Sequence, residues 1–311
     1  MENRVFSGTI IKRFRYHLEK RFSKYITYPK FIFLCGKSYS YDTYYKSNRG
    51  IISNFIKSQK QDVVLVLSEK LWEKDYSKNM DLLTFEEFLA EVSDCIILFV
   101  ESPGTFCELG AFSYADKLFS DKLVVIIDNK YKNEQSFIVR GPVEKCRSNG
   151  SEIIFANLET GDLLSSGELR LSVTKILDRL NDNKHHLNKR ITNFNSEKVY
   201  INSFIIEILE LIKLSQPIKS TQLWDLYKLV KEFRSFTFIK RDGNPFSKEI
   251  NPSHILKLLY NSDLIDIDMD EYITYKSNKI EHLLFNYTEF SEDSDRNRLI
   301  CRKYHFGEKV Q

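Results

Sequence analysis

Short apolar runs in the first half of the chain predict buried β-strands. Within each run the residues are apolar at consecutive positions, which is typical of strands covered on both faces of a parallel sheet. Four runs are strong and the last one is weaker. They span residues 31–35, 63–67, 95–100, 123–127 and 153–155.

Segments with helical spacing separate these runs. Apolar residues recur every three or four positions over residues 82–92, and residues 109–119 form a second candidate helix. Residues 163–180 have the pattern of a closing helix. This alternation of strands and helices predicts an α/β fold with a Rossmann-like doubly wound parallel sheet.

The second half of the chain has a different pattern. Residues 200–214, 221–233 and 252–261 have helical spacing, and residues 264–275 alternate apolar and polar positions around an acidic turn. The alternation predicts a β-hairpin. Three helices followed by a hairpin is the order of a winged helix-turn-helix, although other small helical domains share it.

These patterns divide the chain into four parts. We expect a first domain over residues 1–182 that includes a basic segment over 1–30, and a polar linker over 183–199. A smaller winged-helix-like domain over 200–285 and a polar tail over 286–311 follow.

Composition adds few constraints. The chain has 46 Lys and Arg against 43 Asp and Glu, a net charge of +3, which does not by itself indicate a nucleic-acid-binding protein. Residues 1–30 are locally basic, as expected for a solvated amphipathic helix or for a surface that contacts an acidic partner. Five cysteines without a C-x-x-C pair, no signal peptide and no long apolar run predict a cytoplasmic protein with no membrane segment and no metal site.

The densest candidate chemistry follows the third apolar run. Ligands of open α/β sheets bind at the carboxyl ends of strands, and here the chain reads ESPGTFCELGAF over residues 101–112. Pro103 and Gly104 predict a tight turn, and Thr105 can cap the next helix. We expect Glu108 in the first turn of that helix, facing the crevice, where it is the candidate catalytic residue. The alternative is that Thr105 and Glu108 only form a capping box.

Other residues are expected at the same edge of the sheet. Gly36 ends the first strand, and Gly110 is expected to let the helix approach a neighbour closely. Each nearby carboxylate is an accessory candidate, although each alone is also typical of a capping or surface residue. The candidate nucleotide-binding residues are Gly36, Ser102, Pro103, Gly104 and Thr105, and the candidate accessory carboxylates are Glu101, Asp81 and Asp94.

Residues 94–112 resemble the core motif of nucleoside 2-deoxyribosyltransferases, in which a strand and a Gly-containing turn lead to a Glu-Leu-Gly helix start. The resemblance implies that Glu108 is the nucleophile that takes the sugar C1′ and releases the base. Residues 31–36 are similar to the family's first strand and Gly-ended loop. More narrowly, residues 33–36, 89–91, 96–112 and 136–143 resemble the deoxyribosyltransferase-like effector proteins of bacterial retrons, which also have a winged-helix-like second half.

The chain departs from the transferases at Ser102, where they place an Asp. This departure disfavours base exchange between deoxynucleosides. Nicotinamide needs no protonation to leave NAD, and the retron effectors are associated with nucleotide and NAD glycohydrolysis. The resemblance therefore implies a toxic effector of an antiphage defence system that cleaves the N-glycosidic bond of NAD or a related nucleotide.

The expected partners also come from the resemblance. A retron reverse transcriptase and its branched RNA–DNA product, the msDNA, are expected to restrain the toxic domain. NAD or a nucleotide is expected as substrate and no cofactor is expected, while assembly into a homo-oligomer or filament stays open.

Three other interpretations stay open beside the glycosidase. In the first, the N-terminal domain is a nucleotide sensor that does not cleave its ligand. In the second, it is a transferase that acts on free nucleosides. A DNA-binding regulator is a third interpretation. Against it, the third helix of the second half offers few groups that read bases, and the hairpin is acidic. These groups are Ser253, His254, Lys257 and Asn261.

Overall fold

The computed structural model describes most of the chain, as two compact units. One unit is Lys30–Asp182, and the other joins Asn183–Gln311 with Met1–Pro29. The described residues are 11–12, 15–16, 30–37, 39–59, 63–75, 80–115, 119–159, 163–165, 167–182, 197–246 and 250–276. The expected tail and most of the expected linker lie outside these residues.

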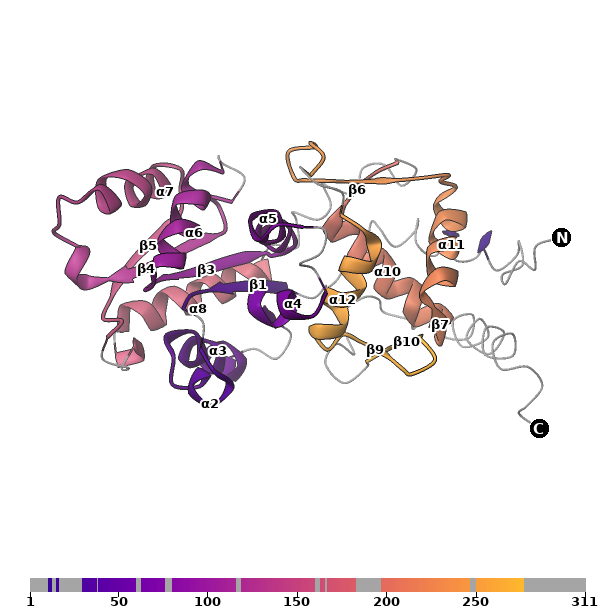
Figure 1. Ribbon diagram of the computed structural model, residues 1–311, viewed down its shortest axis with the longest axis horizontal. Coiled ribbons are helices and arrows are strands. Elements are labelled where there is room, and N and C mark those ends of the chain that lie inside the picture. Colours follow the sequence, from indigo (N-terminus) through magenta and orange to yellow (C-terminus); the bar gives the residue numbers. More distant parts are fainter. Residues whose placement is uncertain are drawn as a thin grey trace. The chain divides into compact units, whose positions relative to one another are not determined.

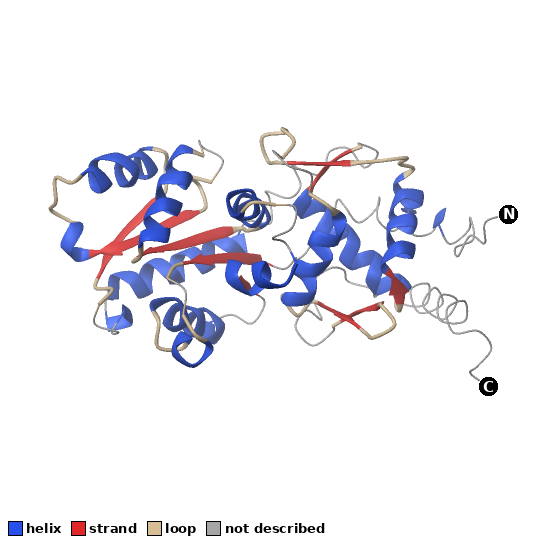
Figure 2. Ribbon diagram, viewed as in Figure 1, coloured by secondary structure: helices blue, strands red, loops and turns tan. Residues whose placement is uncertain are grey.

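A five-stranded parallel sheet forms the centre of the first unit (Figure 2). Its strand order is β2-β1-β3-β4-β5, and each neighbouring pair is parallel. This order confirms the predicted doubly wound α/β fold. The strands are β1 (Lys30–Cys35), β2 (Val63–Val66), β3 (Cys95–Val100), β4 (Leu123–Asp128) and β5 (Glu152–Ala156).

Helices cover both faces of this sheet, with α3 and α8 on one side and α5, α6 and α7 on the other (Figure 1). On the α3 and α8 side, Ile52, Ile56 and Ile176 pack against inward-facing strand residues such as Ile97 and Phe99. The helices are α2 (Tyr41–Tyr44), α3 (Asn48–Gln59), α4 (Ser68–Asp75), α5 (Leu82–Val92), α6 (Pro103–Tyr114), α7 (Glu144–Ser148) and α8 (Gly167–Asp182), with 3-10 turns Asn129–Tyr131 and Leu163–Ser165 and a π-helical turn Val139–Val143.

Two helix boundaries differ from the sequence prediction. α6 begins at Pro103, before the expected cap at Thr105 and before residue 109, where the apolar spacing begins, because Ser102 caps it and proline at the first helical position is preorganised for a helix. The closing helix α8 begins at Gly167 and is preceded by a separate 3-10 turn at Leu163–Ser165.

In the second unit the three predicted helices and the predicted hairpin are confirmed. The first helix is followed by a short strand that pairs with β10 of the hairpin, giving the sheet order β7-β10-β9. The elements are β6 (Lys198–Tyr200), α10 (Ile201–Ser215), β7 (Ile218–Lys219), α11 (Ser220–Lys231), β8 (Thr237–Ile239), α12 (Pro252–Asn261), β9 (Ile265–Ile267) and β10 (Tyr272–Tyr275). The winged-helix interpretation of this unit stays a prediction.

Two assignments made from the sequence need correction at the edges of the units. β6 lies partly within the expected linker, because it pairs in parallel with β8. Residues 1–29 were expected with the first domain, but they are grouped with the second unit, where Arg15 forms an ion pair with Glu232 at the end of α11. In the parts of the chain that the structure describes, no helix has the length and apolar character needed to cross a membrane.

Candidate active site

The candidate site lies where the direction of strand connection reverses, between β1 and β3. From β1 the chain goes to β2 on one side, and β3 then lies on the other side of β1. The loops after two such strands diverge and leave a crevice at their carboxyl ends, which is the ligand position of doubly wound sheets. The residues after β1 and β3 are Gly36–Lys37 and Glu101–Ser102, which therefore border this crevice.

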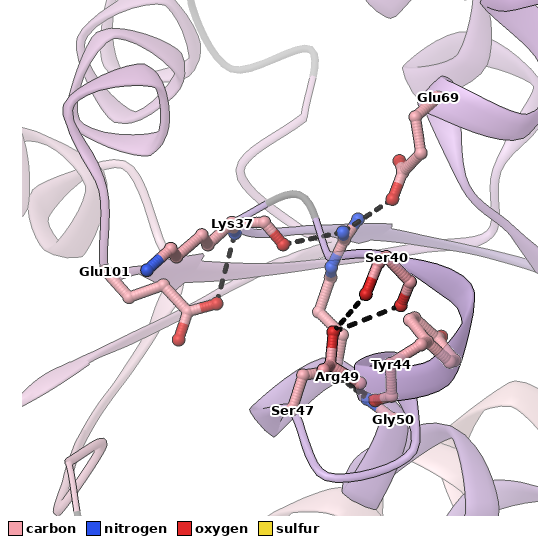
Figure 3. Close-up of polar contacts among 9 residues, drawn as sticks. Lys37, Ser40, Tyr44, Ser47, Arg49, Gly50, Glu69 and Glu101 are labelled. Carbon is pink, nitrogen blue, oxygen red and sulfur yellow. Dashed lines mark hydrogen bonds and ion pairs between the residues drawn. The ribbon is translucent and has the colours of Figure 1, made fainter.

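Glu101 ties the loops of this crevice together. Its Oε1 accepts a hydrogen bond from the backbone N–H of Lys37 at 3.1 Å (Figure 3). Its Oε2 accepts one from the side-chain amide of Asn48 at 2.7 Å. The same Asn48 amide donates to the backbone oxygen of Leu158 at 3.0 Å. Glu101 therefore connects the ends of β1 and β3 with the start of α3, and both its oxygens are engaged.

The start of α6 has a capping arrangement that differs from the expected one. Ser102 is the N-cap residue, and its Oγ accepts a hydrogen bond from the backbone N–H of Thr105 at 3.5 Å. In return, Thr105 Oγ1 accepts from the backbone N–H groups of Ser102 and Glu101, each at 2.9 Å. The capping box is therefore Ser102–Thr105, and the alternative interpretation, a Thr105–Glu108 box, is wrong.

Glu108 has no part in capping, because it lies in the second turn of α6 and not in the first as expected. Its side chain is half-buried, and its Oε2 is buried without a hydrogen-bond partner among the described residues. A carboxylate oxygen in such a position has lost its water without gaining a donor. Burial accordingly raises the pKa of Glu108 to about 7, against the pull of Arg49 in the opposite direction.

Two further carboxyls surround Glu108, and sequence reasoning missed both. Glu86 on α5 is half-buried, and burial together with the charges of Glu108 and Glu69 raises its pKa to about 8. Glu69 on α4 also raises the pKa of Glu108. Paired carboxyls with pKa values near neutrality are typical of acid–base sites. Their positions, 22 and 39 residues before Glu108, gave no local signal.

Arg49 is the cation of this group, and sequence reasoning missed it as well. It is only 1% exposed although it is an arginine, and it forms an ion pair with Glu69 at 2.5 Å. Its Nη2 also donates to the backbone oxygen of Lys37 at 2.7 Å. A fully buried arginine has to be paired, so its position in α3 is fixed by these partners.

The other accessory carboxylates have local roles in the structure. Asp81 caps α5, where it accepts hydrogen bonds from the N–H of Thr84 at 2.9 Å and from its hydroxyl at 3.1 Å. Asp94 accepts from the N–H of Phe31 at 3.0 Å and so joins the starts of β1 and β3. Neither of them is among the groups that shift the pKa of Glu108.

The candidate glycines differ in their surroundings. A Cβ added to Gly36 would lie 2.8 Å from Cδ of Arg49, so the absence of a side chain makes room for the arginine. Gly104 has only Ser102 Oγ near the same position, at 4.0 Å, and Gly110 has nothing within 4 Å. The expected close approach at Gly110 is therefore wrong. The role of Gly36, Ser102, Pro103, Gly104 and Thr105 in nucleotide binding stays a prediction.

Comparison with known proteins gives matches over a large part of the chain. A family model described as STM3845 retron effector protein matches residues 45–267, a range that includes Arg49, Glu69, Glu86 and Glu108. The retron Ec86 putative ribosyltransferase/DNA-binding protein of Escherichia coli is 40% identical over 125 residues. The corresponding retron Ec73 protein, also from Escherichia coli, is 33% identical over 119 residues.

These alignments are partial. They cover 40% and 37% of this chain, and the aligned region spans 39% and 37% of the length of the two relatives. The family model alone covers more than two thirds of the chain, since it matches 223 of 311 residues (45 to 267 inclusive).

Proposed function

Since this chain belongs to the STM3845 family of retron effector proteins, we propose that its first unit is an N-glycosidase that cleaves NAD or a related nucleotide with Glu108 as nucleophile. The observation that carries the proposal is the state of Glu108: it has no capping role, it keeps a buried oxygen without a donor among the described residues, and Arg49, packed over Gly36 at the end of β1, acts on its charge. The two Escherichia coli relatives of this chain are named putative ribosyltransferase/DNA-binding proteins. Ribosyl transfer takes place at the same sugar carbon, C1′.

The proposed reaction has two steps. The ionised carboxylate of Glu108 forms an ester bond to C1′ while the C1′–N bond breaks, and the electron pair of that bond leaves with the base. Nicotinamide leaves NAD as a neutral molecule, because its ring nitrogen carries a positive charge in the substrate. Water then opens the ester, which releases ADP-ribose and a proton and restores the carboxylate.

Substrate choice rests on the residue at the α6 N-cap. The transferases that the chain resembles have an Asp where this chain has Ser102, and the Ser102 side chain is engaged with Thr105. The site is therefore poorly equipped to protonate a leaving base through that position, which favours a substrate whose base needs no proton. At the start of α6, Pro103 has no N–H and the N–H of Thr105 donates to Ser102, so the N–H of Gly104 is the backbone group suited to a phosphate or hydroxyl of such a substrate.

A nucleotide sensor is the second candidate, and the same serine favours it, because a sensor needs no acid at all. Incubating the purified protein with NAD separates the two functions. A glycosidase releases free nicotinamide, whereas a sensor binds the nucleotide and leaves it intact. The assay is run with the protein alone and with its retron partners, since a restrained enzyme is active in only one of these states.

Family membership also supports a restraining complex. We propose that a retron reverse transcriptase and its msDNA hold the effector inactive until defence is triggered. Co-purification of the effector with both partners, and its activity before and after their removal, tests this part of the function.

A further inference from the structure

We propose that Arg49 is a positioning residue for the reaction proposed above: it fixes the loop after β1 and supplies positive charge to the surroundings of Glu108. This inference rests on the proposed function for the meaning of the charge. The contacts that carry it are independent of that function.

The first step is the hold that Arg49 has on the loop after β1. Its guanidinium donates to the backbone oxygen of Lys37 at 2.7 Å (Figure 3). The side chain also packs against Gly36, where a Cβ would lie 2.8 Å from the Cδ of Arg49. The ion pair with Glu69 at 2.5 Å fixes the guanidinium from the side of α4. Three elements of the fold thus meet on one buried side chain.

The second step links this loop to the helix that bears Glu108. The N–H of Lys37 donates to Glu101 at 3.1 Å, and the N–H of Glu101 donates to Thr105 Oγ1 at 2.9 Å. Asn48, next to Arg49 on α3, donates to the other oxygen of Glu101 at 2.7 Å. A continuous series of hydrogen bonds therefore runs from Arg49 to the first turn of α6, and the geometry of that turn sets the direction of Glu108.

The third step is the balance of charge around Glu108. The groups that interact with it are Arg49 from α3, Glu69 from α4, Glu86 from α5 and the Cys35 thiol from β1. Arg49 is the cation that lowers the pKa of Glu108, and Glu69 raises it. Without the arginine, burial and the charge of Glu69 would both favour the protonated form of Glu108, which cannot attack C1′.

Charge variants test this balance through the titration of Glu108 itself. The protein is labelled with carbon-13 at the glutamate side-chain carboxyl carbons, and the Glu108 signal is identified by its absence in Glu108→Gln. Arg49→Met should raise the pKa of Glu108 by about one unit or more, since a nearby opposite charge is lost. Glu69→Gln should lower it. Arg49→Lys keeps the charge and should keep the titration closer to that of the wild type.

Opposite shifts in Arg49→Met and Glu69→Gln would support the inference, because a merely structural role has no reason to produce them. If Arg49→Met does not fold, Glu69→Gln and Arg49→Lys still give the test. A Glu108 titration that is the same in every folded variant would overturn the inference. This result is distinguishable from failure of the proposed function, which is measured separately as nicotinamide release by the wild-type protein.

Discussion

At the scale of single residues, the site depends on carboxyls that are half-buried and poorly partnered. Glu86 and Glu108 have pKa values raised to about 8 and about 7, mainly by burial. Such groups usually lower the stability of a folded protein at neutral pH, because their ionised forms are better solvated in the unfolded chain. The presence of glutamates at these two positions is consistent with a chemical role, since an apolar residue there would lower the stability of the fold less.

A pH-dependent stability follows for Glu86. In the unfolded chain its carboxyl ionises near the ordinary glutamate pKa of 4.5, whereas in the fold its pKa is about 8. The stability associated with the protonated form is therefore complete below about pH 4.5 and is lost as the pH rises toward 8. Glu86→Gln removes this loss. The variant should gain about 3 kcal/mol relative to the wild type between pH 5 and pH 8, measured by urea unfolding at both values.

The matched control for this measurement is Glu134→Gln, at an exposed position. Water solvates the Glu134 carboxylate in the folded and the unfolded chain alike, so its difference from the wild type should stay the same at both pH values. An equal response of the two variants would contradict the assignment of Glu86.

Gly36 and Gly110 give a second prediction at this scale. Gly36→Ala would force a methyl group against the buried Arg49 side chain and should cost about 1–3 kcal/mol, as overpacking does. Gly110→Ala has open space and replaces a glycine inside α6, so it should be neutral or stabilising by about 0.5–1 kcal/mol. Thermal unfolding of both variants checks the pair. A Gly36→Ala protein as stable as the wild type would contradict the described packing.

At the scale of elements, the sequence predicted the strands well and the helix starts less well. The runs that form β1, β3 and β4 are apolar on both faces because the sheet is covered on both sides, so their pattern was unambiguous. The start of α6 was ambiguous, since both Ser102–Thr105 and Thr105–Glu108 have the spacing of a capping box. Proline at position 103 settles the choice in favour of Ser102.

The charge cluster could not be predicted in the same way. The helix α3 is not among the helices expected from the sequence, although Ile51, Ile52, Phe55 and Ile56 have helical spacing. Arg49 meets Lys37 and Glu69 only because α3 and α4 pack near the end of β1, and contacts between separate elements leave no periodic signal in the chain. Sequence reasoning found the nucleophile candidate through a resemblance and missed the residues that set its charge.

A buried ion pair between α10 and α11 gives a third prediction. Lys231 and Glu207 lie 2.7 Å apart with almost no solvent exposure, and Tyr227 donates a hydrogen bond to the same carboxylate at 2.6 Å. Lys231→Met should cost about 3–5 kcal/mol, because it leaves a buried carboxylate uncompensated. Glu207→Gln combined with Lys231→Met should be less destabilised than Lys231→Met alone. Additive losses in urea unfolding would contradict this account of the pair.

The helix α12 offers few side chains for reading bases, which gives a fourth prediction. On α12, His254 Nδ1 accepts from the N–H of Asn251 at 3.2 Å, and Asn261 donates to the backbone oxygen of Lys257 at 2.9 Å. Both side chains are engaged by their own helix. We therefore expect this unit to bind protein or a protein–nucleic-acid complex. In binding measurements on the full-length protein, the affinity for duplex DNA of random sequence should lie within about a thousandfold of the affinity for any selected sequence.

Binding to a selected duplex by more than that margin, lost on His254→Ala or Asn261→Ala, would contradict this prediction. The names of both relatives include the words "DNA-binding". The experiment therefore tests whether this chain has the property that those names state.

At the scale of the whole molecule, the family model spans parts of both units, whereas the alignments with the two Escherichia coli proteins cover about two fifths of the chain. Family membership is therefore a property of the chain as a whole. The proposed chemistry belongs to one place in the first unit, the β1–β3 switch point. The nucleophile and its restraint by retron partners are separate claims, and the nucleophile can be tested first.

The most direct test of the nucleophile is nicotinamide release from NAD by the wild type and by Glu108→Gln, each with and without its retron partners. Glu108 caps no helix and its half-buried carboxyl is poorly partnered, so the Gln variant should unfold at a temperature no lower than that of the wild type. Its nicotinamide release should fall by about a thousandfold or more, because a neutral amide neither attacks C1′ nor stabilises positive charge there. A Glu108→Gln protein that unfolds normally and still releases nicotinamide at the wild-type rate would contradict the assignment of Glu108 as nucleophile.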